Sequence, residues 1–432
     1  MLHPVELVLS LLAVAVGLGI AARRVGVPYP ILLVVGGLLL GLQPWLPPVR
    51  LDPQLVLLLF LPPLLYAAAF QTEWADFRKY LRPILLLAVG LVLFTTAVVA
   101  AVAHHLIGLP WPVAVALGAI VSPPDAVAAV AVTRRLRVPP MVVTLLEGES
   151  LVNDASALVV LRVAVVAAAG TFSVADAGAQ FVAVSLGGVA IGLAGGWLAI
   201  RLHNWLDRRD LADSKLTITI TLLTPFAVYL PAEHLHVSGV LAAVAAGLYV
   251  GTRCEDVFTP VLYDEARAVW EWIEFLLNSL IFILIGFALR PVLDGLSDGY
   301  DPLDLLGYAA AVSAAVIAAR LVWMYPGAYV PRWLDRVLFG VPTPYPPPRA
   351  VFVVGWTGMR GVVSLAAALA LPDIGGKPFP HRDLIQFLTF WVIFATLVGQ
   401  GLTLPWVIRG LGVGGPAVAP GDEGPHDLED RR

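Results

Sequence analysis

Three carboxylates and a hydroxyl stand in one long apolar segment, and their types suit ion chemistry. The segment runs over residues 140–169, and its polar centre contains Glu147, Glu149, Ser150 and Asp154. A charged side chain at the centre of a bilayer costs at least about 2.5–3.5 kcal/mol on insertion scales, so it is rarely present without a function. Such residues commonly mark an ion pathway or a proton relay. Asp154, about fifteen residues from either end of the segment, is the one least able to reach the surface.

Helical spacing places these polar side chains on two neighbouring stripes. At about 100° per residue, Glu147, Ser150 and Asp154 share one stripe. Glu149 and Asn153 share the next one. We expect Asp154 and the Ser150 hydroxyl to bind a small hard cation such as Na⁺, or a proton at the same carboxylate. Two mutually exclusive occupants of one site are sufficient to couple their exchange. A simpler interpretation of Glu147 is an acid drawn to the surface near the start of its helix.

Two apolar segments are interrupted by helix-breaking residues. One contains Ser122-Pro123-Pro124-Asp125, and the other contains the glycine-rich stretch 355–361. Irregular backbone at membrane depth is tolerated only where it lines a cavity or is buried in protein. In the first segment the pattern predicts a new helix with Ser122 as N-cap, Pro123 as first residue and Asp125 as third. Asp125 is then either a cap alone or a cap that also contacts the transported cation.

Arg360 is a permanent cation inside the second interrupted segment, so it requires a partner. We expect Glu149 to be that partner, with Glu147 as second choice.

Three further charged residues have less certain roles. Glu274, and with it Glu147, lies near the expected cytoplasmic entrance, where either could attract cations or sense pH, or could be a plain interfacial acid. For Arg162 the sequence allows a place on a cavity wall, and for Arg320 an extension to the membrane surface.

The composition predicts an all-α polytopic membrane protein. Of 432 residues, 59% are hydrophobic and only 13% are charged, where a soluble domain has about 25% charged residues. Thirteen apolar windows are long enough to be membrane spans. Their approximate cores are 5–22, 29–42, 54–70, 83–106, 111–132, 140–169, 178–202, 215–231, 237–250, 269–290, 304–330, 350–372 and 384–409.

The basic residues predict the orientation of these spans. Twenty lysines and arginines fall in alternate loops beginning after the first span, and four fall in the other loops. The positive-inside rule then places the C-terminus in the cytoplasm and the N-terminus outside the cell membrane. We expect a membrane domain over residues 1–410 and a short disordered cytoplasmic tail over residues 411–432, which is rich in glycine, proline and acidic residues.

The two interrupted spans, the fifth and the twelfth, are seven spans apart and so run in opposite directions. This predicts two inverted six-helix repeats, spans 1–6 and 8–13, with span 7 as linker and a transport site near the midplane. No phosphate loop of the GxxxxGK[ST] type is present, so ATP is not expected as energy source. The single cysteine and the absence of metal-ligand spacing argue against a metal cluster. We expect no cofactor and no nucleic-acid partner.

Three motifs resemble the cation:proton antiporter family of bacterial NhaP-type proteins and animal sodium/proton exchangers. They are Phe60-Leu61-Pro62-Pro63-Leu64-Leu65-Tyr66, Glu147-Gly148-Glu149-Ser150-Leu151-Val152-Asn153-Asp154 and Gly358-Met359-Arg360-Gly361-Val362-Val363-Ser364-Leu365. The resemblance implies a homodimer whose six-helix core moves like an elevator against a rigid interface domain. It implies that Asp154 is the shared carboxylate with Ser150 beside it, that Asn153 supports the crossing helices, and that Glu149 pairs with Arg360. An Asn-Asp pair in this family accompanies electroneutral exchange.

The sequence departs from the family pattern at two places. The usual Thr-Asp-Pro of span 5 is Pro124-Asp125-Ala126 here, and Ala67 replaces the acid that often follows Leu-Pro-Pro in span 3. Both changes remove oxygen ligands, so they leave the identity of the cation open.

The expected function is export of cytoplasmic Na⁺, or of Li⁺ or K⁺, in exchange for H⁺. A K⁺/H⁺ antiporter is the nearest alternative. An intramembrane aspartyl enzyme using Asp125 and Asp154 is a remote one, since no Gly-x-Gly-Asp signature is present. A passive channel would not require a single carboxylate as its bottleneck.

Overall fold

The protein is helical throughout the described part of the chain. The computed structural model describes residues 4–43, 53–170, 174–211, 213–296, 300–340 and 344–415. Within these ranges the one β feature is an isolated bridge between Ile374 and Lys377. The helices are α1 (Pro4–Val25), α2 (Tyr29–Gly41), α3 (Pro53–Leu59), α4 (Leu61–Phe70), α5 (Trp74–Lys79), α6 (Leu81–Leu85), η1 (Leu86–Leu91), α7 (Val92–Val102), η2 (Ala103–Ile107), α8 (Trp111–Val121), α9 (Ala126–Arg135), α10 (Pro140–Ala168), α11 (Val174–Asp207), α12 (Ser214–His234), α13 (Gly239–Val257), α14 (Pro260–Phe287), α15 (Leu289–Asp294), α16 (Pro302–Phe339), α17 (Pro348–Trp356), α18 (Val362–Leu369), α19 (Arg382–Phe394), η3 (Ala395–Gln400) and α20 (Gly401–Leu411).

Each predicted span coincides with one or more of these helices. Eight helical stretches in the described residues are long and apolar enough to cross a membrane, and three shorter apolar helices accompany them. The first window corresponds to α1, and the twelfth to the broken pair α17 and α18. The fold class is therefore confirmed, while the number of thirteen crossings stays a prediction. The predicted tail lies almost entirely outside the described residues, which end at Gly415.

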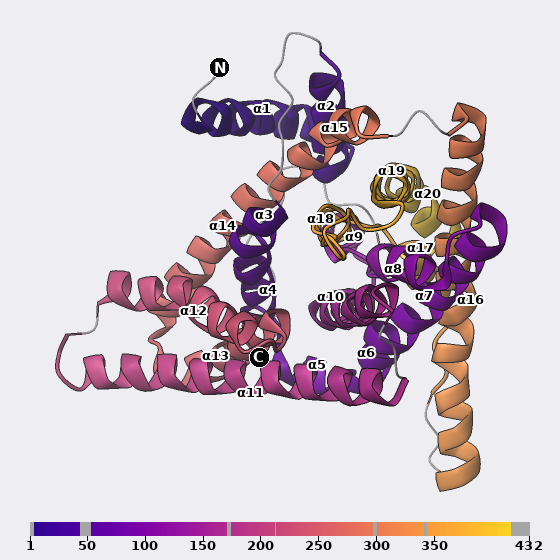
Figure 1. Cartoon of the computed structure of the whole chain (residues 1–432). Helices are drawn as coiled ribbons and strands as arrows, with labels where there is room; N and C mark the ends of the chain where they lie inside the picture. Colours follow the sequence, from indigo (N-terminus) through magenta and orange to yellow (C-terminus); the bar gives the residue numbers. More distant parts are fainter. Residues whose placement is uncertain are drawn as a thin grey trace.

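The helices form two groups (Figure 1). We call the first the crossing bundle; it consists of α6–α10 and α16–α20 with their η segments, and its members pack on one another through α10 against α8 and α16 against α7 and α17. We call the second the outer bundle; it consists of α1–α4 and α11–α15, in which α13 packs against α4, α11 and α12, and α14 packs against α2. Helix α10 lies at the boundary and contacts α4, α11 and α13.

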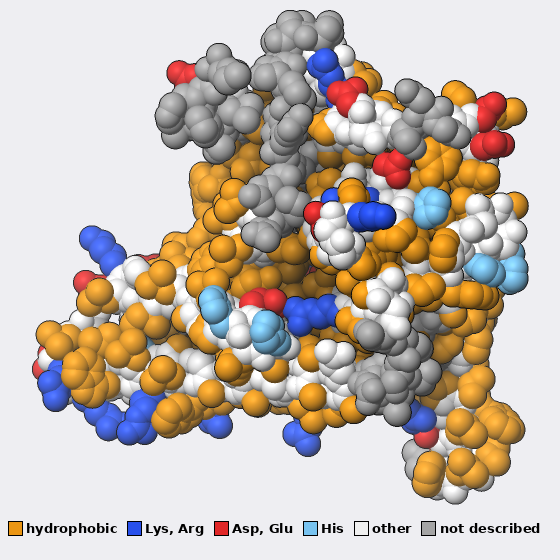
Figure 2. Space-filling model, in the orientation of Figure 1, with side chains coloured by type: hydrophobic (Ala, Val, Ile, Leu, Met, Phe, Trp, Pro, Cys, Tyr) orange, Lys and Arg blue, Asp and Glu red, His pale blue; other side chains and the backbone are white. Residues whose placement is uncertain are grey.

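The outer surface suits a lipid environment. Large apolar side chains such as Leu186, Trp197 and Trp406 are exposed. In the view of Figure 2 most of the surface is hydrophobic. Water-soluble monomers rarely expose apolar patches of this extent. A bilayer around the helices accounts for them.

Candidate functional site

The two interrupted helices meet at their breaks, which lie within the crossing bundle. Helix α8 ends at Val121 and α9 begins at Ala126, while α17 ends at Trp356 and α18 begins at Val362. The Asp125 backbone N–H donates to the Met359 carbonyl across the crossing at 2.7 Å. Residues 122–125 and 357–361 are therefore the two irregular segments that the prolines and glycines predict.

The predicted cap of the first break is wrong in register. Asp125 itself is the N-cap of α9, with extended backbone, and its Oδ1 accepts the Val127 N–H at 2.9 Å. Ser122 instead closes α8, and its hydroxyl donates to the Ala119 carbonyl at 3.0 Å. The physical reason is the second proline: Pro124 disfavours helical backbone at Pro123, so Pro123 is a poor first residue for a helix capped by Ser122.

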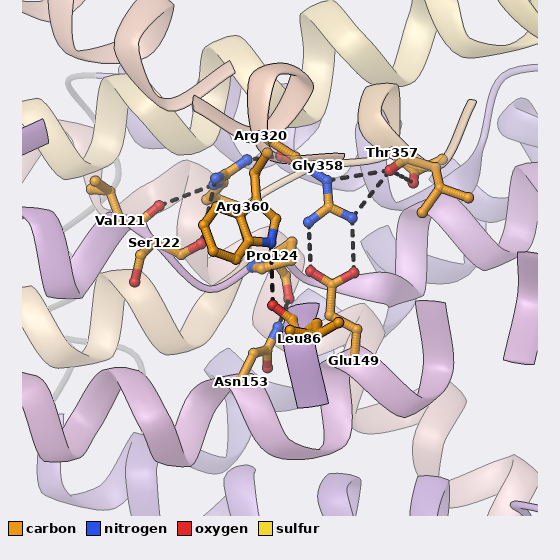
Figure 3. Close-up of polar contacts among 12 residues, drawn as sticks. Leu86, Val121, Ser122, Pro124, Glu149, Asn153, Arg320, Thr357, Gly358 and Arg360 are labelled. Carbon is orange, nitrogen blue, oxygen red and sulfur yellow. Dashed lines mark hydrogen bonds and ion pairs between the residues drawn. The ribbon is translucent and has the colours of Figure 1, made fainter. Parts of the chain in front are cut away.

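Two buried arginines compensate the carbonyl ends of the half-helices (Figure 3). Arg360 donates from Nε to the Val121 carbonyl at 3.0 Å and from Nη2 to the Ser122 carbonyl at 3.4 Å, at the end of α8. Arg320, from α16, donates from Nη2 to the Val354 carbonyl near the end of α17 at 3.1 Å. The last carbonyls of a helix lack partners and carry partial negative charge, so a cation stabilises them.

Asp125 lies at the N-terminal ends of the other two half-helices, α9 and α18, where backbone N–H groups are free to bind a carboxylate. It caps α9, and its Oδ2 lies against Gly361, the N-cap residue of α18. A Cβ atom on Gly361 would stand 1.9 Å from Oδ2, so only glycine fits at this position. One carboxylate thus faces the starts of both half-helices, where negative charge is favoured.

The predicted ion pair between Glu149 and Arg360 is wrong, because Glu149 binds Arg320 instead. Arg320 Nη1 lies 2.5 Å from Glu149 Oε1 and Nη2 lies 2.8 Å from Oε2, with both side chains 1% exposed (Figure 3). Arg360 is equally buried but satisfied by helix carbonyls, which removes its need for a carboxylate. The predicted extension of Arg320 to the membrane surface is also wrong, because Arg320 sits in the middle of α16, out of reach of either end.

Breaking the pair of Glu149 and Arg320 is expected to destabilise the protein strongly. Either Glu149→Gln or Arg320→Met leaves one charge buried alone, which costs about 3–5 kcal/mol of the free energy of unfolding. The double variant is expected to lose much less than the sum, because the two residues interact directly. Denaturant unfolding of the purified protein in detergent measures all three. The matched control is the partly exposed pair of Arg134 and Glu147, where each loss is expected to stay within about 1 kcal/mol. Strictly additive losses for Glu149 and Arg320 would contradict the pairing.

Asn153 and Asp154 bring α10 to the crossing. The Asn153 side-chain amide donates to the Pro124 carbonyl at 2.8 Å and is fully buried, in agreement with its predicted supporting place. Asp154, the next residue, is 7% exposed. Within the described residues its carboxylate forms no hydrogen bond or ion pair, although it is close enough to Asp125 for their charges to interact. Ser150 lies one turn earlier on α10 and is half-buried. The crossing thus lies beside a buried carboxylate that has no hydrogen-bond or ion-pair partner among the described residues.

Glu147 and Glu274 lie away from the Asp154 carboxylate. Glu147 is in the N-terminal part of α10, and Glu274 is on α14. Glu147 forms an ion pair of 2.6 Å with Arg134. Glu274 accepts a hydrogen bond of 3.0 Å from the Gln71 side chain, and its charge interacts with those of Arg134 and Glu147. These residues form an acidic and basic cluster, in the place where the sequence suggests an entrance.

Sequence reasoning missed two contributors to the crossing. The Thr396 hydroxyl, in the η3 segment, accepts the Arg360 backbone N–H at 3.1 Å. Gly361 is required by Asp125, as described above. Nothing in the sequence near Thr396 indicates this contact, because it depends on packing between helices. The glycines of residues 355–361 predict an interrupted helix, but their pattern does not indicate which glycine lies against a carboxylate.

The comparisons with known proteins agree with this geometry. The family model described as sodium/hydrogen exchanger, transmembrane, matches residues 9–410. The chain belongs to this family. Family members are transporters, so the aspartyl-enzyme alternative is set aside. One relative, an uncharacterised Na⁺/H⁺ exchanger of Mycobacterium tuberculosis, is 38% identical over 411 residues, covering 94% of this chain and 74% of the relative. Another, a sodium, potassium, lithium and rubidium/H⁺ antiporter of Bacillus pumilus, is 34% identical over 407 residues, covering 92% of this chain and 60% of the relative.

A solved structure supports the family fold. The sodium proton antiporter MjNhaP1 of Methanocaldococcus jannaschii superposes with a TM-score of 0.70 at 19% identity, covering 94% of this chain and 98% of that one. The likeness confirms the fold class that the sequence predicts.

Proposed function

We propose that this exchanger exports cytoplasmic Na⁺ in exchange for H⁺, with Asp154 as the carboxylate that carries either ion. The observation that carries the proposal is a buried Asp154 that forms no hydrogen bond or ion pair with the described residues and lies beside the crossing of two broken helices. A buried carboxylate is stable only when it is neutralised or paired. A proton neutralises it by protonation, and a cation neutralises it by pairing, so the two ions exclude each other. Ser150, one turn earlier on α10, and Asp125, whose charge interacts with that of Asp154, are candidates for further oxygen ligands of the cation.

The charges around the site support electroneutral exchange. Arg320 and Arg360 carry two positive charges, and Glu149, Asp125 and Asp154 carry three negative charges. One additional positive charge, from either a proton or a monovalent cation, brings this group to neutrality. Moving the loaded group through the membrane then transfers no net charge in either direction. The supporting residues Asn153, Glu149, Arg360 and Ser122 hold the breaks in place.

The wider setting follows the sequence expectations. We propose a homodimer in the cell membrane, with the N-terminus outside and the C-terminus in the cytoplasm, in which the crossing bundle moves relative to the outer bundle. The loops assigned to the cytoplasm carry twenty lysines and arginines and the loops assigned to the outside carry four, which supports the orientation. Glu147 and Glu274 lie where cytoplasmic cations would enter under this orientation.

K⁺ is the second candidate substrate. The Bacillus pumilus relative carries sodium, potassium, lithium and rubidium in its name. Ala67 in span 3 and Pro124 in span 5 replace residues that carry an oxygen ligand in the family pattern, so fewer oxygens are available to select a small cation over a larger one.

Purified protein in proteoliposomes with an internal pH dye tests the function. Each alkali chloride is added outside at equal concentration. Na⁺ is expected to alkalinise the lumen most, with Li⁺ next. An equal or larger response to K⁺ would make the protein a K⁺/H⁺ antiporter, and no response to any alkali cation would contradict antiport.

A further inference from the structure

An ion pair far from the crossing joins the two bundles. Arg162 of α10 and Glu233 of α12 approach to 2.9 Å between Nη2 and Oε2, and to 3.2 Å between Nη2 and Oε1. The sequence gives Arg162 no assigned role. Among the ion pairs between residues that the structure describes, this pair alone connects the crossing bundle to the outer bundle.

Glu233 is held in place by its own bundle. Its Oε1 also accepts the backbone N–H of Gly239, at the start of α13, at 3.1 Å. A Cβ on Gly239 would stand 2.7 Å from the Tyr229 ring and 3.0 Å from Glu233. The amide end of α13 favours a carboxylate at this position. Glu233 is therefore a fixed acceptor, and Arg162 is the member that the crossing bundle brings to it.

An apolar layer separates the pair from the candidate ion site. Between Asp154 and Arg162 on α10, Ala155 and the half-buried Leu158 pack in one cluster with Tyr229 and other apolar residues of the outer bundle. Arg162 lies eight residues beyond Asp154 on α10, a rise of about 12 Å. The pair thus stands above a closed apolar seam, on the side toward which α10 and α12 both end. Under the proposed orientation this is the extracytoplasmic side.

The opposite end of the seam is built differently. There Arg134 pairs with Glu147 inside the crossing bundle, and Gln71 bonds to Glu274 inside the outer bundle. At this end the bundles are joined by a hydrogen bond from Arg135 to the Gly26 carbonyl and by apolar packing of α9 against α2.

We propose that Arg162 and Glu233 form the extracytoplasmic gate of the exchanger: the pair closes the seam above Asp154 and must separate each time the site opens outward. The side chains are 42% and 34% exposed. Ion pairs with this much solvent contact are weak, which suits a closure that opens in every cycle. The proposal rests on the antiport function above and assigns two residues that the ion site does not use.

Crosslinking tests whether the seam opens. Cys254→Ala removes the single cysteine, and Arg162→Cys with Glu233→Cys then provides two thiols for a short rigid bismaleimide. Crosslinked molecules are expected to lose more than nine-tenths of cation-driven proton flux, while the same variant treated with N-ethylmaleimide keeps its flux. The matched control joins Arg82→Cys to Asp335→Cys, an ion pair within the crossing bundle, and is expected to stay active when crosslinked. Full flux through molecules crosslinked between residues 162 and 233 would overturn the gate. Absence of flux in the untreated parent would instead contradict the proposed function.

Charge variants test whether the pair itself keeps the seam closed. A Leu158→Cys reporter in the seam is labelled from outside by a membrane-impermeant maleimide, in the same Cys254→Ala parent. Arg162→Gln or Glu233→Gln is expected to raise the labelling rate about 1.4- to 5-fold, the range for ion pairs of this exposure. The exchanged pair, Arg162→Glu with Glu233→Arg, is expected to return the rate toward that of the parent. Equal labelling of the parent and both neutral variants would overturn the role of the pair. This readout needs no transport, so it is independent of the identity of the cation.

Discussion

Asp154→Asn is expected to fold and dimerise normally and to lose cation-driven proton movement entirely. The asparagine side chain has nearly the same volume but can neither take up a proton near neutral pH nor pair with a cation. Because Asp154 makes no hydrogen bond or ion pair with described residues, its replacement breaks no contact that stabilises the fold. Sodium-driven alkalinisation in proteoliposomes, together with a melting curve of the detergent-solubilised protein, measures both properties.

The control for Asp154→Asn is a carboxylate on the surface of the same protein. Glu271→Gln removes an exposed acid whose ion pair among the described residues is with Arg267, one turn away on α14, and it is expected to leave flux near the wild-type rate. Near-normal flux in Asp154→Asn would exclude a single shared carboxylate. Asp125 would then be the first residue to examine as a second titrating group.

The sequence predicted where the two helix breaks lie because local chemistry determines that much. A proline pair and a glycine cluster interrupt helices wherever they occur, so both breaks are found where expected. The depth of Asp154 within a long apolar segment indicated a functional carboxylate before any fold was known. The Asn153 contact with Pro124 also follows once the first break is placed beside α10.

Partner choice could not be predicted in the same way. Glu149 and Arg320 are 171 residues apart in sequence, and only the packing of α16 against α17 and its neighbours brings them together. A buried guanidinium can be satisfied by helix carbonyls as well as by a carboxylate, and Arg360 is satisfied in this way. Arg320 also donates to a helix carbonyl, but it pairs with the Glu149 carboxylate as well.

The prediction of the helix cap was wrong for a local reason. The residues Ser122 to Asp125 match the Ser-x-x-Asp capping pattern, but two consecutive prolines stand between them. Pro124 disfavours helical backbone at Pro123, which argues against a helix capped by Ser122, and the observed cap is Asp125. The steric rule outweighs the hydrogen-bonding pattern here. The position of the cap matters for function, because Asp125 Oδ1 accepts a hydrogen bond from its own helix while Oδ2 lies against Gly361 at the crossing.

Competition between Na⁺ and H⁺ is expected to appear as a strong pH dependence of the apparent sodium constant. A proton on Asp154 excludes the cation, so the constant rises as pH falls below the pKa of the site and stays level above it. The rise approaches tenfold per pH unit, because one proton displaces one cation and each unit corresponds to about 1.4 kcal/mol. Saturating Na⁺ is expected to abolish the inhibition. If the exchange is electroneutral, clamping the membrane potential leaves the rate unchanged.

The number of protons released when Na⁺ binds tests the shared carboxylate most directly. Calorimetric titration of the detergent-solubilised protein, repeated in buffers of different ionisation enthalpy, gives that number without any gradient or membrane. At a pH at least about one unit below the transition seen in transport, the wild type is expected to release close to one proton per cation bound. The Asp154→Asn variant is expected to bind no cation and release no proton. Saturable Na⁺ binding to the wild type without proton release, at every pH between about 5 and 8, would contradict one carboxylate that serves both ions.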